Sequence, residues 1–142
     1  MDSIPFLDTN VVVRFVAQDH LDHWRRATEL FKSVERGEMR VRITDTVVFE
    51  TAYVLKGPYG WGREPIRAAL TPVIAFDGVI LTDKEIYPDV FALYVSRRSL
   101  TFADCYHAVL SQHLGCTAFI SFDRGFDRIP GLSRIEPLAA GR

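Results

Sequence analysis

Four acidic residues occupy positions from which their carboxylates could converge on one metal site. Asp8 and Asp123 each follow a short apolar run of the kind that forms a buried strand, whereas Glu50 and Asp104 lie in segments with helical patterns. Hard divalent cations such as Mg²⁺ and Mn²⁺ prefer several oxygen ligands. A cation held in this way activates water and stabilises charge on a phosphoryl group during hydrolysis. The four acids therefore suggest metal-dependent hydrolysis, in which no basic side chain is needed as nucleophile or base.

Three of these acids also have a purely structural interpretation, which the sequence alone leaves open. Asp8 belongs to the residue types that cap helices well. Asp104 lies three residues after Thr101, a spacing that resembles a capping box, although Asp replaces the usual Glu or Gln. Asp123 is a residue type that favours turns. The sequence does not decide between a structural role and metal binding for any of the three.

Glu50 is the least expected of the four acids at its position. Val47 and Val54 share its face of the predicted helix, so we expect Glu50 to be buried among apolar side chains. A buried carboxylate must be protonated, paired or bound to a metal, because an isolated buried charge is costly. The alternative is a glutamate at the edge of the apolar stripe that reaches solvent.

Other catalytic chemistries are not supported by the motifs of this chain. Cys105 and His107 are two residues apart on one predicted helix and point in different directions, which disfavours a zinc site. The glycine-rich segment 57–62 lacks a G-K-[ST] motif and does not follow a strand, so it is interpreted as a turn and not as a P-loop. No serine lies in a G-x-S-x-G motif.

The hydrophobic patterns predict strands and helices that alternate along the chain. The predicted strands are 4–7, 41–44, 79–81, 117–121 and 134–136. The predicted helices are 10–16, 21–35, 45–56 with Asp45 as its cap, 66–75 with a kink or early end at Pro72, 85–98 and 102–114. Alternation of this kind indicates an α/β fold, a three-layer α/β/α sandwich with a central parallel sheet of four to five strands. Ligands of such folds bind at the carboxyl ends of the strands, where we expect Asp8 and Asp123.

Length and composition predict a single soluble domain that spans residues 1–142. No apolar run approaches the roughly 18 residues that cross a bilayer, and the first residues do not resemble a secretory signal. Cys105 and Cys116 are therefore predicted to be free thiols of a cytoplasmic protein. No contact with membranes is expected.

The net charge of −1 gives no support for nucleic-acid binding. Most of the 17 basic residues are nevertheless arginine, which suits bidentate phosphate contacts better than lysine does. Local arginine clusters occur at 25–26, 40–42, 97–98 and 124–128. Scattered, solvated surface charge remains an equally good explanation of these clusters.

With these residues in place, the chain resembles the PIN-domain family and, within it, the VapC-like toxins of toxin–antitoxin pairs. The resemblance covers almost the whole chain. It rests on four motifs in order, which are Phe6-Leu7-Asp8-Thr9-Asn10, Glu50 within 47–55, Asp104-Cys105-Tyr106-His107-Ala108, and Ser121-Phe122-Asp123-Arg124-Gly125-Phe126. Ser121 stands where the family pattern has Thr. Each motif is weak alone, and their order makes the match specific.

The resemblance implies that Asp8, Glu50, Asp104 and Asp123 form an acidic site for Mg²⁺, or alternatively Mn²⁺. Thr9, Asn10 and Ser121 are implied as candidates that support that site. Arg14 and Arg124 are candidates for contact with RNA. The implied activity is endonucleolytic hydrolysis of structured RNA such as tRNA or rRNA, which leaves a 3′-hydroxyl and a 5′-phosphate. The implied partners are a cognate antitoxin protein and a second copy of the chain in a homodimer.

Two other functions are considered. A catalytically inactive PIN scaffold would bind RNA or a protein partner without cutting, although none of the family's acids is missing here. A haloacid-dehalogenase-like phosphatase also begins with a strand followed by Asp, but it requires D-x-D, and the third position here is Asn10. The nuclease is therefore the leading hypothesis.

Overall fold

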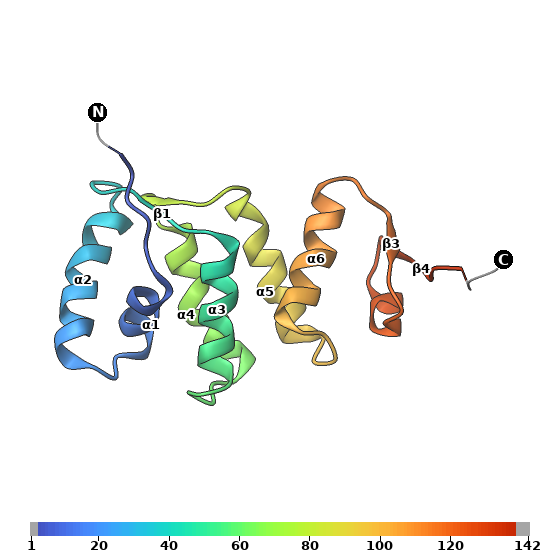
Figure 1. The fold of residues 1–142 in the computed structure, drawn as a ribbon, viewed down its shortest axis with the longest axis horizontal. Helices are drawn as coiled ribbons and strands as arrows, with labels where there is room; N and C mark the ends of the chain where they lie inside the picture. The colour runs from blue at the N-terminus through green and yellow to red at the C-terminus, as the bar shows by residue number, and fades with distance from the viewer. Residues whose placement is uncertain (1–2, 139–142) are drawn as a thin grey trace. The chain divides into compact units, whose positions relative to one another are not determined.

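A computed structural model describes residues 3–138 of the chain (Figure 1). By internal contacts the chain divides into two compact units, residues 1–87 (unit 1) and residues 88–142 (unit 2). Both contain helices and parallel strands, so the fold class is α/β, as predicted.

Unit 1 contains four helices, one short 3₁₀ helix and two short strands. In chain order these are α1 (Thr9–Ala17), α2 (Leu21–Glu35), β1 (Val41–Arg42), α3 (Asp45–Lys56), α4 (Arg63–Ala75), β2 (Val79–Ile80) and η1 (Lys84–Ile86). Helix α1 packs against both α2 and α3, side by side in Figure 1. This packing fixes the segment that leads from the first strand-like residues into α1.

The strands of unit 1 run parallel, with β1 in the middle. Val41 of β1 pairs with Val79 of β2. On its other side β1 meets the N-terminal segment through a parallel bridge between Phe6 and Arg42, where the Leu7 amide donates to the Arg42 carbonyl at 2.9 Å. The predicted strand 4–7 is thus a single bridge, and its carboxyl end leads directly into α1.

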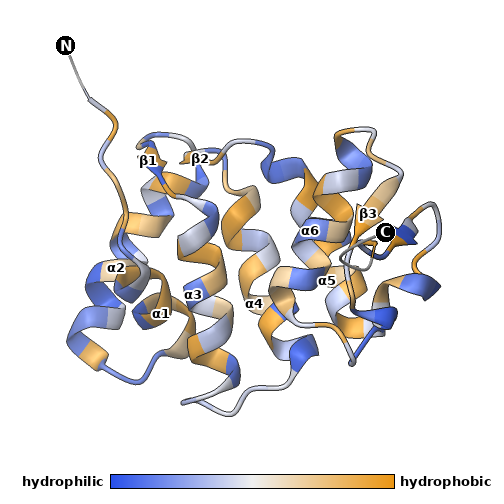
Figure 2. Cartoon of the chain, turned by 45° about the vertical axis from the view of Figure 1, so that its right-hand side comes forward, coloured by the Kyte–Doolittle hydropathy of each residue, from blue (hydrophilic) through white to orange (hydrophobic). Residues whose placement is uncertain are grey.

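Helix α2 has the bounds that its periodicity predicts. Its apolar stripe is buried through Ala27, Phe31 and Val34, and the Phe31 ring lies 4.4 Å from that of Phe15 on α1. The helix is followed by Gly37, whose φ of +76° is accessible to glycine without strain. Figure 2 shows the resulting alternation of hydrophobic and hydrophilic residues along α2.

Two predicted helix ends of unit 1 are wrong. Asp45 is the first helical residue of α3 and not its cap, a position that Thr44 takes. Helix α4 begins at Arg63, three residues before the predicted start, because a proline in the first turn such as Pro65 loses no helical hydrogen bond. Pro72 does not end the helix, which continues to Ala75.

Unit 2 contains two helices and a second pair of parallel strands. In chain order these are α5 (Tyr87–Ser96), α6 (Phe102–His113), β3 (Ala118–Ile120), the 3₁₀ helix η2 (Arg124–Arg128) and β4 (Ser133–Ile135). Ala118 pairs with Ser133 and Ile120 with Ile135. The predicted strands near 117–121 and 134–136 are therefore present, and they are hydrogen-bonded to each other.

The predicted single sheet of four to five strands is not seen in the described part of the chain. Residues 3–138 instead form two two-stranded parallel sheets, one in each unit. A strand of two or three residues is too short to show an alternating hydrophobic pattern. The sequence therefore does not predict how many strands pair with one another, or in which order. Among these residues no helix has the length and hydrophobicity of a bilayer span, and neither Cys105 nor Cys116 is in a disulfide, as predicted.

Candidate active site

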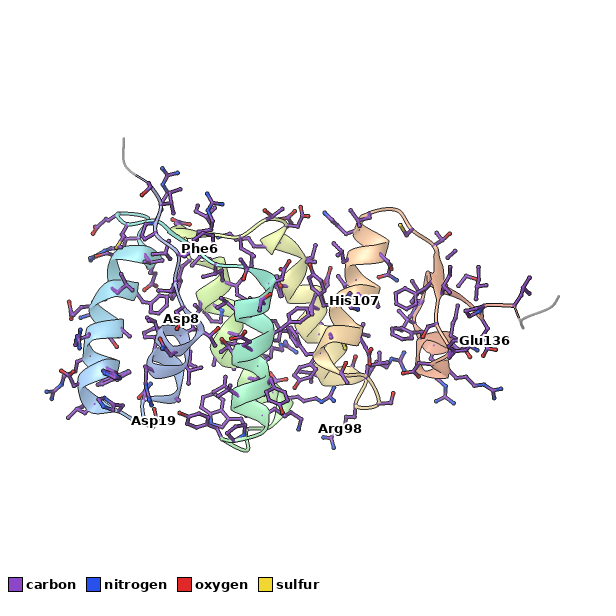
Figure 3. All side chains as sticks on the ribbon, viewed as in Figure 1. Phe6, Asp8, Asp19, Arg98, His107 and Glu136 are labelled. Atoms are coloured by element: carbon purple, nitrogen blue, oxygen red, sulfur yellow. The ribbon has the colours of Figure 1, made fainter. Side chains whose placement is uncertain are left out.

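Asp8 stands at the carboxyl end of the N-terminal bridge and immediately before α1. Its backbone has the extended conformation of a cap residue, yet its carboxylate makes no capping hydrogen bond. The side chain is exposed, and Figure 3 shows it where the N-terminal segment enters α1. The structural explanation of Asp8 as a side-chain cap is therefore not supported, and neither carboxylate oxygen is used to cap α1.

Thr9, the next residue, links this end of α1 to Glu50 on α3. Its hydroxyl donates a hydrogen bond of 2.8 Å to Oε2 of Glu50. A hydroxyl that donates to an ionised carboxylate fixes the rotamer of a long, otherwise mobile side chain. This hydrogen bond joins Glu50 to Thr9, the residue directly after Asp8, although Thr9 and Glu50 are 41 positions apart in the sequence.

The expectation that Glu50 is buried is wrong. Glu50 is exposed, while Val47 and Val54 on the same face of α3 are half-buried. The face lies at the edge of the buried stripe of α3, which consists of Val48, Ala52 and Leu55 together with Thr51. Burial therefore gives no reason for Glu50 to bind a metal. The hydrogen bond from Thr9, which orients the carboxylate, is the observation that bears on its role.

Asp104 forms the capping box that its spacing from Thr101 suggests. Its Oδ2 accepts from the Thr101 amide at 3.0 Å, and the Thr101 hydroxyl accepts from the Asp104 amide at 3.1 Å. This arrangement satisfies two amides at the start of α6 that have no helical partner. The carboxylate is half-buried and oriented, and its second oxygen, Oδ1, is not used by the box.

Asp123 lies in a turn that its own side chain stabilises. Oδ1 accepts from the Gly125 amide at 2.7 Å, which starts η2, and the Asp123 amide donates to the Ser121 hydroxyl at 3.0 Å. The turn interpretation of Asp123 is thus correct, and Ser121 contacts this turn directly. One carboxylate oxygen, Oδ2, remains for another ligand.

The segments that carry Asp104 and Asp123 meet within unit 2. A Cβ added to Gly125 would lie only 3.1 Å from Leu100, the residue before the Thr101 cap. In addition, the Arg97 guanidinium donates to the Arg128 carbonyl at 3.1 Å. The start of α6 and the turn at Asp123 are therefore held against each other.

Arg134 of β4 connects this turn to the strands. Its guanidinium donates to the Ser121 carbonyl at 3.0 Å and to the carboxylates of Asp127 at 2.6 Å and Glu136 at 2.7 Å. The hydrogen bond from Arg134 lowers the pKa of Asp127, and the same two acids raise the pKa of Arg134 further above its usual range. Arg134 thus stays charged and holds the backbone of Ser121 in place through its hydrogen bond to the Ser121 carbonyl. The side chain of Arg124, one residue after Asp123, is exposed.

Arg14 on α1 is held by an acidic partner. Its guanidinium lies 3.2 Å from Asp19, which also accepts a 2.5 Å hydrogen bond from the Tyr59 hydroxyl. That bond from Tyr59 is the largest cause of the lowered pKa of Asp19, followed by smaller contributions from Arg14. Asp19 therefore remains ionised and fixes Arg14 close to the surface. Asn10, by contrast, is exposed and lines a pocket between α1 and α2.

One further acid near this edge was not predicted as part of a site. Asp45 follows β1 as Asp8 follows the bridge segment, and its carboxylate accepts a hydrogen bond from the Tyr87 hydroxyl. An acid directly after a predicted strand was a signal available in the sequence. The predicted site residues are thus divided between the units, with Asp8, Thr9, Asn10, Arg14 and Glu50 in unit 1 and Asp104, Ser121, Asp123 and Arg124 in unit 2.

Comparison with known proteins places the chain in a family. The sequence model of the PIN domain matches residues 6–132, which include all four acids, and the chain belongs to the PIN-domain family. It is 30% identical over 136 residues to VapC ribonuclease Mb1869c of Mycobacterium bovis. Ribonuclease VapC13 of Mycobacterium tuberculosis matches to the same extent. Each alignment covers 91% of this chain and 97% of the relative.

Proposed function

We propose that this protein is a divalent-metal-dependent endoribonuclease and the toxin of a VapBC-type toxin–antitoxin pair. The observation that carries the proposal is its 30% identity, over 91% of its length, to two relatives named VapC ribonuclease. Almost the whole length of those relatives is matched, which supports a single nuclease domain over residues 1–142. The substrate is then RNA, with structured RNA such as tRNA or rRNA as the class to test first.

The proposed metal site consists of Asp8, Glu50, Asp104 and Asp123. Four carboxylates are a donor set that fits Mg²⁺ or Mn²⁺, which are hard cations with oxygen ligands. The family model matches residues 6–132, which include all four acids, and this match supports their assignment as metal ligands.

The hydrogen bonds of these acids support a role as ligands. Neither carboxylate oxygen of Asp8 caps α1, and the Thr9 hydroxyl orients Glu50 through a hydrogen bond of 2.8 Å to its Oε2. Asp104 and Asp123 each use one oxygen within their own turns and keep the other. A bound divalent cation would supply an activated water and stabilise charge at the phosphoryl group. Asn10 and Ser121 complete the proposed support of the site.

Arg124 is exposed beside Asp123, where a guanidinium can contact the RNA backbone, and Arg14 is proposed as a second contact. We also propose a cognate antitoxin, a homodimer and a cytoplasmic location, and the likeness to VapC proteins supports these parts of the proposal. None of them is needed for the cleavage test.

Cleavage of labelled tRNA by the purified protein tests the proposal, with Mg²⁺ or with excess EDTA. Asp8→Asn is compared with Asp77→Asn, which neutralises an exposed acid outside the proposed site. We expect Asp8→Asn to lower kcat at least about 100-fold, since even residues that only support metal ligands change activity by up to that factor. Asp77→Asn should cut like the wild type.

Three results would contradict the nuclease. Full activity in EDTA would exclude metal dependence, and equal activity of Asp8→Asn and Asp77→Asn would remove Asp8 from the site. Tight binding of tRNA by wild type with no cleavage in Mg²⁺ or Mn²⁺ would favour the non-cutting scaffold.

A further inference from the structure

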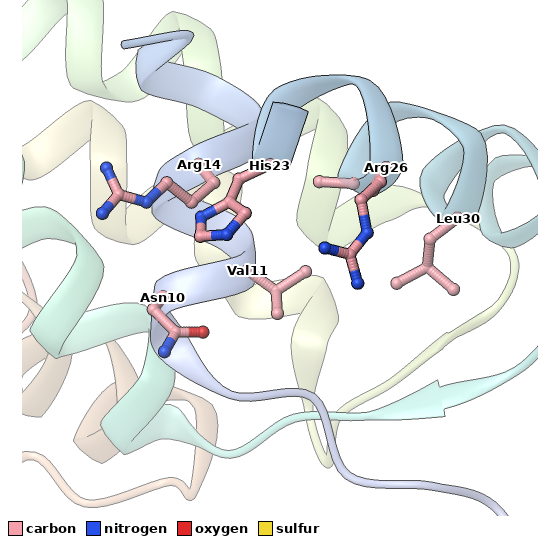
Figure 4. Close-up of a pocket in the computed structure, with 7 residues that line it drawn as sticks. Asn10, Val11, Arg14, His23, Arg26 and Leu30 are labelled. Atoms are coloured by element: carbon pink, nitrogen blue, oxygen red, sulfur yellow. The ribbon is translucent and has the colours of Figure 1, made fainter. Parts of the chain in front are cut away.

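A pocket of about 380 Å³ lies between α1 and α2 in unit 1. Its lining residues are Asn10, Val11, Arg14, His23, Arg26, Ala27 and Leu30 (Figure 4). Its size falls in the range of pockets that hold small molecules, which is roughly 300–1,000 Å³. Three of the lining residues are apolar, two are arginines, and none is acidic. A ligand that suits this lining carries negative charge together with an apolar, flat or compact part.

The two arginines of the pocket differ in how firmly they are held. Arg14 is fixed by Asp19, as described above, and in Figure 4 its guanidinium points away from Arg26. The Arg26 guanidinium lines the pocket together with Val11 and Leu30, and Figure 4 shows it drawn between them. Its only ion pair in the described structure is with Asp22 at 3.4 Å, and both side chains are about 70% exposed. Such an exposed pair is weak, so it leaves the Arg26 guanidinium able to bind an anionic ligand.

His23 provides a second recognition element on the same wall. Its ring stacks on that of His20, with centroids 3.8 Å apart and planes inclined by 21°. The His23 amide also donates to Nδ1 of His20 at 3.1 Å, which ties the two residues together at the start of α2. The stack covers one face of the His23 ring and leaves a positioned imidazole in the pocket lining.

The pocket is adjacent to the acids of unit 1 through α1. Asn10, which lines it, follows Thr9, and Thr9 is bonded to Glu50 and preceded by Asp8. Asp8, Thr9 and Asn10 are consecutive at the start of α1, so the pocket lining begins two residues after Asp8.

We propose that this pocket holds one nucleotide of the RNA beside the cleaved bond, an assignment that rests on the proposed nuclease function. Arg26 contacts the phosphate in a bidentate manner, while Val11, Ala27 and Leu30 pack against the base. Recognition of single-stranded RNA commonly combines basic contacts to the backbone with base contacts to flat or apolar surfaces. Asn10 and His23 offer hydrogen-bonding groups to the edge of the base.

The first test compares two adjacent arginines of α2. Arg25→Ala and Arg26→Ala remove the same charge from neighbouring exposed positions, but only Arg26 lines the pocket. Binding of a fluorescein-labelled single-stranded RNA decamer is measured in EDTA, so that binding is read without cleavage. We expect Arg26→Ala to raise Kd about 10-fold, the lower part of the range for loss of a specific contact, and Arg25→Ala about twofold at most. Equal loss in both variants, or none in Arg26→Ala, overturns the assignment.

The second test needs no substitution and localises the ligand. Adenosine monophosphate and inorganic phosphate are titrated separately into isotope-labelled wild-type protein and followed by NMR. Adenosine monophosphate should shift the Arg26 Nε–H and the Val11 and Leu30 methyl signals, whereas phosphate should shift the Arg26 signal without the methyl groups. Identical shifts with both ligands, or shifts only outside the pocket, contradict a nucleotide site. Neither test measures cleavage, so a result that contradicts the nucleotide pocket can be distinguished from one that contradicts the proposed nuclease function.

Discussion

The observed cap role of Asp104 can be separated from its proposed role as a metal ligand by breaking its capping box from either side. Thr101→Ala removes the hydroxyl that accepts from the Asp104 amide but leaves the carboxylate in place. Asp104→Ala removes the carboxylate that accepts from the Thr101 amide at 3.0 Å. If Asp104 is only a cap, the two variants should behave alike toward Mg²⁺. If it is also a ligand, only Asp104→Ala should lose part of the response to Mg²⁺.

The magnitudes can be estimated from the contacts. Loss of a helix cap costs about 1 kcal/mol, which for a chain of this length lowers Tm by roughly 2–4 °C. A metal site filled at ten times its Kd stabilises the fold by about 1.4 kcal/mol, which raises Tm by roughly 3–6 °C. If the proposed four-acid site exists, removal of Asp104 from the metal-free protein also relieves repulsion between like charges, which opposes the loss of the cap. The increment caused by Mg²⁺, and not the metal-free Tm, is therefore the deciding quantity.

Differential scanning calorimetry of wild type and both variants, in EDTA and in about 5 mM Mg²⁺, an excess intended to fill a weak oxygen-ligand site, measures this increment. We expect Thr101→Ala to melt lower than wild type but to keep the whole increment. Asp104→Ala should keep less than half of it. Equal increments in the two variants would show that Asp104 only caps α6, and the proposed four-carboxylate site would then be wrong.

Two other substitutions follow from single contacts. Thr9→Val removes the hydroxyl that orients Glu50 and should lower kcat/KM for RNA about fivefold, the effect of roughly 1 kcal/mol for one exposed hydrogen bond. Thr9→Ser keeps a hydroxyl and should retain activity. If the Thr9→Ser enzyme were as slow as Thr9→Val, the loss would come from packing and not from the hydrogen bond. Gly78→Ala would place a methyl group 2.1 Å from the Met39 carbonyl oxygen, so we expect urea unfolding to show a loss of stability above about 3 kcal/mol. The control is Gly62→Ala, whose added carbon would lie at an ordinary 3.5 Å from Pro65 and should leave stability nearly unchanged. Similar midpoints for the two alanine variants would contradict this backbone packing.

The sequence predicts the long, periodic elements best. Helix α2 has three buried residues at regular spacing and a glycine directly behind its last turn, so its pattern and its stop signal agree. The strands are only two or three residues long, and their pairing depends on hydrogen bonds between segments far apart in sequence. No local pattern specifies such pairing, and the predicted single sheet therefore went beyond what the residues alone determine.

The same distinction applies to the candidate site. The capping box at Asp104 and the turn at Asp123 follow from spacings of two or three residues, which sequence analysis captures. The exposure of Glu50 and its bond to Thr9 depend on how α3 packs beside α1. Periodicity shows which residues share a helix face, but it does not show whether that face lies at the centre or the edge of the core.

The structural and the functional interpretations of these acids are compatible at the level of single oxygen atoms. Asp104 uses Oδ2 for the Thr101 amide, and Asp123 uses Oδ1 for the Gly125 amide. A carboxylate that is held by one oxygen loses its rotational freedom, so its second oxygen occupies a defined position before any ligand arrives. Glu50, held through Oε2 by Thr9, is in the same condition. In the proposed site, the caps and turns that first competed with metal binding as explanations would therefore be the interactions that orient the ligands.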